Sequence, residues 1–460
     1  MKNTIEIQEL WTRVEKATND GLPRTAIENL DKIIELSSQI EDYNNFLKAF
    51  SQRIVFESTI EGNKAQDKVI LLKKYMEGAD SSLKPVLKAI LAKWYWHFFD
   101  SARWRFSQRT ETVSLDDDDI MTWDLKKILG EIDSLYTDIL KEKELLSKIP
   151  TSIFSDFFTT PSFGKELRPT LYDFMVMEAV TFYTQAENHI IKPTDAFEID
   201  FDAVCISTKD FVNYKPDTTD KESPKYKVIK LYQELINLHI AEKNMAALAD
   251  TELSRLVYLK NNSFGENKNI KFIERLEETL KISDNQYVNS AIYYNIAKAW
   301  QDEEELEKAV EIADKGYKLY SRTPGGKSCL NLMQEITASR FNLSINRLYG
   351  EKEKKEISIK YRNTPKLYFR IYAQKWDEFL QDRNVYPYYF DTQKIPSIIS
   401  QKPYREWEIT LPSTPDYKEK QEIITFPEIE NGFYRIFTSS DKNFPQNKIS
   451  HDWFWVSNLG

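Results

Sequence analysis

The sequence predicts an α + β multidomain protein in which a long helical region precedes a smaller domain of antiparallel strands. Up to about residue 350, apolar residues recur at the three- and four-residue spacing of amphipathic helices. Beyond it, stretches 404–411 and 433–438 alternate in the two-residue period of pleated strands. The length of 460 residues is enough for two to four domains with cores of their own. We expect an α-solenoid of helical hairpins, similar to tetratricopeptide repeats, followed by an antiparallel β-sandwich.

The amino-acid composition and net charge disfavour some classes of function. Hydrophobic residues make up 41% and charged residues 29%, which is ordinary for a soluble globular protein. The 12 glycines are few for a large enzyme built on many glycine-rich loops. The formal net charge is −9, and the acidic excess lies before residue 351. An acidic body repels phosphate backbones, so we expect no nucleic-acid partner.

Breakers and charge runs divide the chain into four expected segments. Prolines at 193 and 216 and the polar run 217–223 interrupt the helical pattern, which indicates a mobile loop between two helical subdomains. The charged run 351–356 marks the change to strands. The expected segments are helical region I (1–190), an irregular connection (191–223), helical region II (224–350) and the β-sandwich domain (351–460). We expect proteases to cut first within 192–223 or near 350–355.

In helical region I, breakers and apolar stripes outline the helices. The expected helices are 5–18, one beginning at Pro23, 81–109, 123–147 and 171–189. The aromatic run 94–99 is typical of a thick, largely buried helix rather than of a binding surface. Four consecutive aspartates, 116–119, lack the alternating ligands and central glycine of a calcium loop, and favour an acidic lead-in to the next helix.

Helical region II reads as paired helices. The expected helices are 226–241, 245–259, 271–280, 285–300, 303–320 and 328–348. Small residues Ala309, Ala313 and Gly316 oppose larger ones such as Tyr293 and Trp300, which is the order that lets two tetratricopeptide-type helices nest. This hairpin is the best repeat candidate in the chain.

The last 110 residues or so contain six or seven expected strands. The clearest are 355–363, 366–372, 404–411 and the pair flanking Asn431-Gly432, where we expect a tight turn with positive φ. Stretch 376–380 is expected to be a helical turn or a loop. The final residues, 451–460, read as a strand cut in mid-course, and the chain as an excised fragment lacking an export signal and downstream modules.

The sequence predicts no catalytic, cofactor-binding or metal-binding residue. Stretch 323–328 (TPGGKS) imitates a phosphate loop, but it lacks the first glycine and the preceding strand, so a helix stop and restart is favoured. His97, His189, His239 and His451 show no metal-ligand spacing. Cys205 and Cys329 stand far apart, which favours two buried free thiols over one long-range disulfide. Carboxylates are plentiful, and sequence alone leaves open which of them face one another.

Several motifs carry a resemblance to a known family. They are Arg168–Phe174 (RPTLYDF), Leu348-Tyr349-Gly350, Tyr361-Arg362-Asn363, Leu367–Tyr372, and Pro427 with Asn431–Ile436. Together they resemble the start of the large α-2-macroglobulin-like envelope proteins of Bacteroidetes-type bacteria, in which a helical region precedes the first macroglobulin-like β-sandwich domain. Neither cysteine stands in the C-x-E-Q run that forms the thioester of some members.

The resemblance implies a role and a location. It implies protease trapping or another envelope defence by a whole protein, to which this chain contributes a non-catalytic N-terminal portion in the periplasm or on the surface of a Gram-negative cell. The implied partners are proteins, namely proteases or envelope components, and the parent's downstream domains; no cofactor and no membrane span are implied. An α-solenoid docking scaffold of the cell envelope is the alternative, and a helical hydrolase with a β accessory domain is the second alternative.

Overall fold

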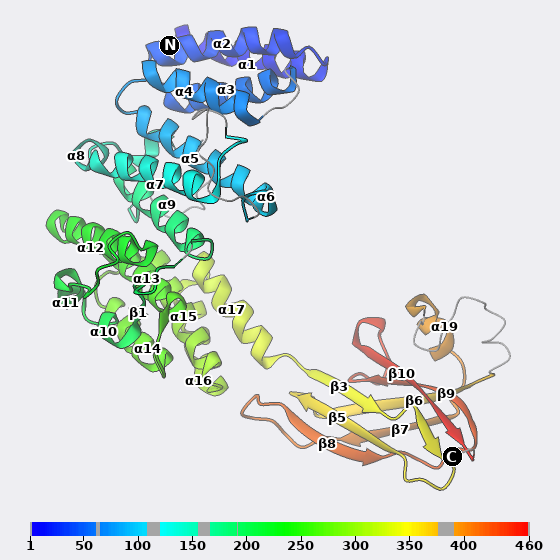
Figure 1. The fold of residues 1–460 in the computed structure, drawn as a ribbon. Coiled ribbons are helices and arrows are strands. Elements are labelled where there is room, and N and C mark those ends of the chain that lie inside the picture. Colours follow the sequence, from blue (N-terminus) through cyan, green and yellow to red (C-terminus); the bar gives the residue numbers. More distant parts are fainter. Residues whose placement is uncertain are drawn as a thin grey trace. The chain divides into compact units, whose positions relative to one another are not determined.

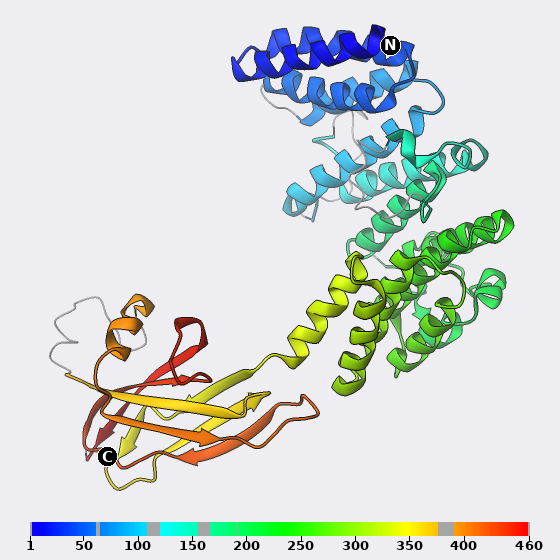
Figure 2. The same ribbon diagram turned by 180° about the vertical axis from the view of Figure 1, so that it is seen from behind.

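The computed structural model describes residues 2–60, 65–107, 120–154, 166–190, 192–375 and 391–458. Two compact units emerge from the packing, residues 1–288 and 289–460, and each is described by itself (Figures 1 and 2). The first is built mainly of helices, and the second combines helices with sheets whose strand pairs are mostly antiparallel. The predicted combination of a helical part and a later part with antiparallel strands is therefore confirmed. The aspartate run 116–119 and stretch 376–380 lie outside the described residues.

The first unit is a succession of helices with few strands. Its long helices are α1 (Lys2–Asn19), α2 (Pro23–Gln39), α3 (Tyr43–Ile60), α4 (Ala65–Gly78), α5 (Lys84–Ser101), α7 (Leu125–Lys141), α9 (Leu171–Ala186), α12 (Pro224–Glu242), α13 (Met245–Asn262) and α14 (Lys268–Thr279). Shorter elements are α6 (Arg103–Ser107), α8 (Lys143–Leu146), the 3-10 turn η1 (Thr151–Phe154), α10 (Phe201–Val204) and α11 (Thr208–Asn213), with the strand pair β1 (Ile199–Asp200) and β2 (Ser263–Phe264).

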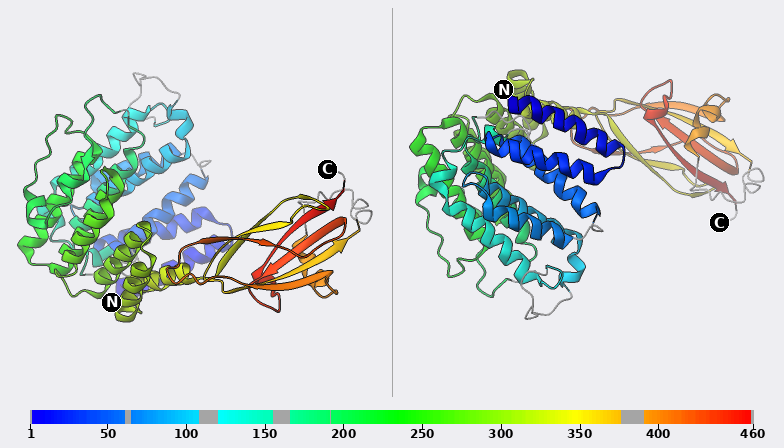
Figure 3. Two further views of the ribbon diagram at one scale, coloured as in Figure 1. Left: turned by 90° about the horizontal axis from the view of Figure 1, so that it is seen from below. Right: turned by 90° about the horizontal axis from the view of Figure 1, so that it is seen from above.

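Each long helix packs against the helices next to it in the order of the chain. α1 packs on α2, α2 on α3, and the series continues through α5, α7, α9, α12, α13 and α14 (Figure 3). Helix α2 packs against both α1 and α3. Ala26, Leu30 and Ile33 on its apolar stripe are fully buried by this packing. Small residues among large ones let adjacent helix axes approach.

The segment 192–223, which lies in the expected irregular connection (191–223), packs several side chains into the first unit. It contains β1, α10 and α11, and its apolar side chains Phe201, Val204 and Phe211 are fully buried. Two distant side chains secure its backbone: Gln233 donates to the carbonyls of Phe211 and Tyr214, and Arg255 donates to those of Val204 and Ile206. These partners lie on α12 and α13, so contacts with distant residues hold part of the segment that prolines and polar residues predicted to be a mobile loop.

The second unit begins with helices that nest tightly. α15 (Gln286–Asp302) leads into α16 (Leu306–Tyr320) and α17 (Pro324–Thr337). Ala309 and Ala313 are fully buried, and a Cβ on Gly316 would lie 2.7 Å from Tyr293 Cβ and 2.8 Å from Cys329 Sγ. The predicted small-to-large packing of this hairpin is confirmed. α17 ends at Thr337, so the helix expected over 328–348 extends eleven residues too far.

Strands begin immediately after α17, because residues 340–350 pair with distant strands instead of continuing the helix. The strands are β3 (Arg340–Ile345), β4 (Leu348–Gly350), β5 (Glu356–Arg362), β6 (Lys366–Gln374), β7 (Arg405–Thr410), β8 (Lys420–Thr425), β9 (Gly432–Ser439) and β10 (Ile449–Ser457). They form a five-stranded sheet, β4-β10-β9-β6-β7, and a three-stranded sheet, β3-β5-β8. All pairings are antiparallel except that of β4 with β10. The expected boundary at 350/351 therefore falls inside the β region.

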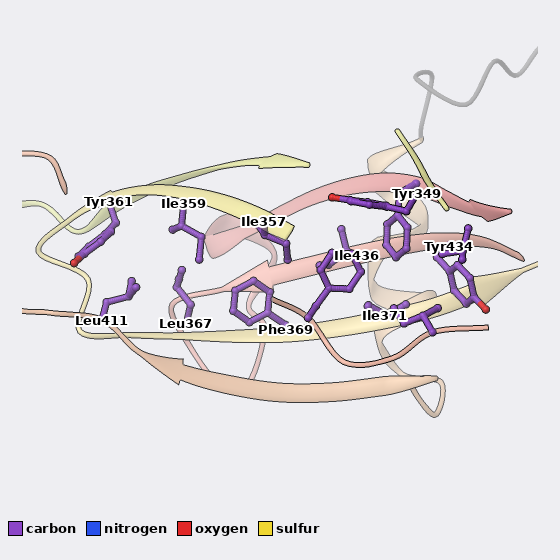
Figure 4. Packing of buried hydrophobic residues seen from close by; sticks show 14 residues of the cluster. Tyr349, Ile357, Ile359, Tyr361, Leu367, Phe369, Ile371, Leu411, Tyr434 and Ile436 are labelled. Atoms are coloured by element: carbon purple, nitrogen blue, oxygen red, sulfur yellow. The ribbon is translucent and has the colours of Figure 1, made fainter. Parts of the chain in front are cut away.

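The inner faces of the two sheets share one hydrophobic core (Figure 4). Ile357, Ile359 and Tyr361 project from the three-stranded sheet toward side chains of the five-stranded sheet. The buried residues of this core are Tyr349, Ile357, Ile359, Tyr361, Leu367, Phe369, Ile371, Leu411, Phe426, Ile429, Tyr434, Ile436, Phe454 and Val456. The alternation read from the sequence is confirmed in β9, where Tyr434 and Ile436 face this core and Phe437 faces a second cluster.

Two turns in the β region differ from the sequence expectation. Neither Asn431 nor Gly432 has a positive φ. Gly432 instead lies under the ring of Tyr434, where a Cβ would come within 3.1 Å of the phenol oxygen. The charged run 351–356 is a tight turn between β4 and β5. There the buried ammonium of Lys355 donates to the carbonyls of Gly350, Glu351 and Glu353.

Candidate functional site

A pocket with an apolar lining and a few polar groups lies within the first unit. Its volume is about 750 Å³, within the usual range for small-molecule sites. Four segments contribute its lining: the end of α6, the N-terminal half of α7 with its cap, the C-terminal end of α9 with residues 189 and 190, and the start of α12 with residue 222 before it. The lining residues are Phe106, Asp124, Leu125, Lys126, Leu129, Gly130, Asp133, Phe182, Tyr183, Ala186, His189, Ile190, Glu222, Pro224 and Lys227.

Three helices bring a polar cluster to this pocket. Asp133 Oδ1 on α7 accepts hydrogen bonds from Tyr183 Oη on α9 at 2.8 Å and from Lys227 Nζ on α12 at 2.9 Å. Lys227 also pairs with Glu222 at 2.9 Å, and its ammonium lies 5.6 Å from the centroid of the Tyr183 ring. This arrangement fixes the cluster across three elements that are far apart in the sequence.

Protonation states in the cluster follow from burial and charge. Burial raises the pKa of the Tyr183 phenol, and the Asp133 carboxylate raises it further, so the phenol stays protonated and donates. Burial opposes the charged form of Lys227, yet its hydrogen bonds to Asp133 and Glu222 raise the pKa of the ammonium above its ordinary value. The cluster therefore holds a neutral phenol and a charged lysine at neutral pH.

Much of the remaining wall of the pocket is apolar or aromatic, and Asp124 and Lys126 are its other charged residues. Phe106 packs edge-on against Phe99 at 5.6 Å, and the His189 imidazole packs edge-on against the same ring at 5.1 Å. Burial, followed by the nearby Arg103 charge, lowers the pKa of His189. The imidazole is therefore neutral at pH 7 and presents a weakly polar edge. Phe182, another lining residue, stacks on Tyr136 at a ring-centroid distance of 5.6 Å.

Gly130 lines the pocket from the middle of α7. Glycine inside a helix costs roughly 0.5–1 kcal/mol relative to alanine. At Gly316, by contrast, the absence of a side chain allows close packing against Tyr293, which offsets the lower helix propensity. A Cβ built on Gly130 meets nothing within 4 Å, so no neighbour requires a glycine there. Its missing side chain leaves open space at the pocket wall.

A second polar cluster lies at the start of α9. Thr170 caps the helix in a reciprocal capping box with Asp173, whose Oδ1 lies 3.0 Å from His239 Nε2 on α12. Arg168 Nε donates to Asp250 Oδ2 on α13 at 3.2 Å. Burial raises the pKa of Asp250, against the opposing charge of Arg168. Asp173 and His239 are fully buried, so this cluster joins three helices and offers no access to a substrate.

The residues that the sequence singled out are spread over the fold. His97 lies on the exposed face of α5, His239 is fully buried, and His189 and His451 are half-buried on different units. Among the described residues, no three His, Cys, Asp or Glu side chains are grouped to hold a metal ion. Cys205 and Cys329 are buried free thiols, as predicted, and burial raises the pKa of each to about 11.

Stretch 323–328, which resembles a phosphate loop in sequence, forms the start of α17. Thr323 accepts from the Gly326 N–H as the helix cap, Pro324 occupies the first turn, and the preceding element is a helix. A Cβ on Gly325 would lie 2.5 Å from the Ser290 backbone, and one on Gly326 would lie 1.9 Å from the Tyr320 carbonyl oxygen. These glycines serve helix packing, which confirms the predicted stop and restart.

Sequence reasoning missed the pocket because its polar residues come from distant segments. Asp133 and Tyr183 are separated by 50 positions, and Asp133 and Lys227 by 94. One local signal was present: a glycine at position 130 inside a strongly periodic helix, which calls for a packing or functional reason. No described helix is both long and apolar enough to cross a bilayer.

Comparison with known proteins adds no relative: no protein-family model matches this chain, and a search of curated proteins finds no significant match.

Proposed function

We propose that this chain is the N-terminal portion of a bacterial α-2-macroglobulin-like envelope protein and that it acts by binding other proteins, without catalysis. In this proposal, the helices form a TPR-like α-solenoid and the strands form the first macroglobulin-like β-sandwich domain. The partners are proteases or envelope components together with the parent's downstream domains, and the location is the periplasm or cell surface of a Gram-negative bacterium.

One observation carries the proposal: the side chains on which the resemblance rests are the ones that hold the β unit together. Tyr349, Phe369 and Tyr434 belong to the core shared by the two sheets. The Tyr349 phenol also donates to the Glu356 carbonyl, and the Tyr434 phenol donates to that of Glu430. These three side chains come from three separate stretches and share one core, as expected for residues that specify one type of domain.

The helical motif 168–174 supports the proposal in the same way. Arg168 contacts Asp250, Tyr172 Oη donates to Glu234 Oε2 at 3.0 Å, and Asp173 contacts His239. Each of these side chains bridges α9 to α12 or α13 inside the first unit. The motif therefore joins helices and specifies a scaffold, in keeping with a protein that works through shape and surface.

The docking-scaffold alternative draws support from the way the helices pack. Each long helix of the first unit packs on the one before and the one after it, an arrangement typical of stacked hairpins that present broad surfaces to protein partners. The β unit adds an open strand edge at β8, whose Ile423 is 62% exposed. This alternative needs no downstream domain.

The gene on either side of the region coding residues 1–460 distinguishes these two roles. We expect consecutive strand-rich segments of about 100 residues after residue 460, the size of a β-sandwich. A stop codon directly after this region would overturn the α-2-macroglobulin-like assignment and leave the docking scaffold.

A substrate screen tests the non-catalytic part of the proposal. The purified chain is incubated with glycoside and peptide substrates, and we expect no turnover above the buffer blank. Turnover that a single carboxylate substitution abolishes would establish the hydrolase alternative and overturn this part of the proposal.

A further inference from the structure

We propose that the pocket between α7, α9 and α12 binds a primary ammonium group carried on an apolar chain or ring. This inference does not depend on the proposed role of the whole protein. Because the pocket is formed within the first unit alone, every contact in the argument lies inside one compact body.

The volume and lining favour an apolar body. A space of about 750 Å³ bordered by Leu129, Phe182 and Ala186 would remove the apolar surface of a ligand from water, which favours binding. Phe106 and the neutral edge of His189 extend this wall. The absence of a side chain at Gly130 enlarges the pocket, although a glycine inside a helix lowers the stability of that helix. Because no neighbouring atom requires a glycine there, packing alone does not explain it.

The charge balance favours a cation over an anion. Asp133 and Glu222 contribute two carboxylates at the polar end, against the single ammonium of Lys227. Asp124 and Lys126 also line the pocket, and their charges cancel. The titratable lining groups therefore sum to one net negative charge, with His189 neutral. An added ammonium brings this sum to zero, whereas a carboxylate ligand doubles the imbalance.

The hydrogen bonding leaves an acceptor for that ammonium. Tyr183 and Lys227 both donate to Oδ1 of Asp133, and no described residue donates to Oδ2. An ionised carboxylate has about four acceptor positions, so Oδ2 retains capacity for a donor from a ligand. A hydrogen bond between a charged donor and a charged acceptor is stronger than one between neutral groups. Such a bond to Asp133 would orient the ammonium of the ligand toward α7.

Displacement of a fluorescent probe tests the inference on the full 460-residue chain. N-phenyl-1-naphthylamine, which is neutral and brightens in apolar sites, is bound first and then displaced by decylamine, decanol or decanoate below their micelle-forming concentrations. We expect decylamine to displace the probe at least tenfold more effectively than decanoate, with decanol between them. Absence of saturable probe binding, or a preference for decanoate, overturns the proposal.

Substitutions assign the binding to this pocket. Gly130→Leu places a side chain in the open space, and we expect at least a tenfold loss of affinity for all three ligands without loss of thermal stability. Gly78→Leu is the matched control, because a Cβ there also meets nothing within 4 Å and it lies on α4. Unchanged binding in Gly130→Leu would contradict the location.

A second variant tests the charge argument without disturbing the fold. The side chain of Glu222 is 87% exposed, so Glu222→Gln should fold normally while removing one carboxylate. We expect the advantage of decylamine over decanol to shrink several-fold while decanol binding stays the same. An undiminished advantage for decylamine would overturn the assigned role of the acidic groups.

Discussion

Gly316 shows how a single missing methyl group sets the distance between helices. It lies on α16, opposite Tyr293 of α15 and Cys329 of α17. Alanine at an open position in a helix would gain up to about 1 kcal/mol over glycine. Here the added Cβ would sit 2.7 Å from one carbon and 2.8 Å from one sulfur, well inside van der Waals contact. The clash therefore outweighs the gain in helix propensity.

We predict that Gly316→Ala destabilises the protein by roughly 1–3 kcal/mol, the usual cost of overpacking a core. Chemical denaturation followed by circular dichroism measures the change. Gly78→Ala serves as the control, since its Cβ meets no neighbour and should leave stability unchanged or slightly higher. Equal midpoints for the two variants would show that the helices can separate at no cost.

His451 on β10 gives the β unit a dependence on pH. Burial lowers the pKa of its imidazole below the ordinary 6.5, and the charge of the buried Arg435 lowers it further. The unfolded chain therefore takes up the proton first as the pH falls. The stability linked to this histidine is complete above about pH 6.5 and is lost progressively below it, until the folded state protonates as well.

We predict that His451→Gln flattens the pH dependence of stability between pH 7 and pH 5, since glutamine does not titrate. Urea denaturation of both proteins at several pH values measures it. The difference between the two free energies of unfolding should change across this window and be constant above pH 7. A constant difference throughout would mean that the imidazole titrates alike in both states.

At the scale of elements, the end of α17 is coupled to the turn between β5 and β6. Asn363 adopts a left-handed backbone, with φ of 52°, and its side-chain amide donates to the carbonyls of Ile336 and Ala338. Arg362 donates to the carbonyl of Glu335. The last carbonyls of a helix lack partners within it, so these side chains supply them and join the helix to the sheet.

We predict that Asn363→Ala costs roughly 2 kcal/mol, because alanine tolerates the left-handed conformation poorly and leaves two carbonyls without their donor. Denaturation followed by near-ultraviolet circular dichroism reports it. Asn342→Ala is the control, an asparagine exposed on the neighbouring β3 and expected to change stability by less than about 0.5 kcal/mol. A loss of similar size in both variants would contradict the capping role.

At the scale of the whole molecule, proteolysis should follow packing rather than composition. The proline and polar content of 192–223 suggested early cleavage, yet Arg255 and Gln233 secure its backbone and Phe211 is buried. We predict that native trypsin leaves 192–223 intact while it cuts elsewhere first. Mass spectrometry of the earliest fragments decides this, with the urea-unfolded chain as the control. Early cuts inside 192–223 would restore the mobile-loop interpretation.

Much of the fold could be read from local pattern. The periodicity of 171–186, the proline at position 23 and the alternation in 356–362 each specify an element through neighbours within a few residues. The prediction failed most clearly at 340–345, which was expected to continue a helix. Phe341, Leu343 and Ile345 stand at the two-residue spacing of a strand, and they pair with Tyr361, Ile359 and Ile357 of β5.

The sequence by itself determined the two kinds of secondary structure, the small-to-large packing of the α15–α16 hairpin and the two unpaired cysteines, because each depends on residue type and short spacing. Only the tertiary structure decided that 192–223 packs side chains into the first unit, that strands begin at residue 340, and that Asp133, Tyr183 and Lys227 meet beside Gly130 in one pocket. The physical reason is that periodicity reports which face of an element is buried, whereas the identity of the partner on that face is set by contacts between residues tens of positions apart.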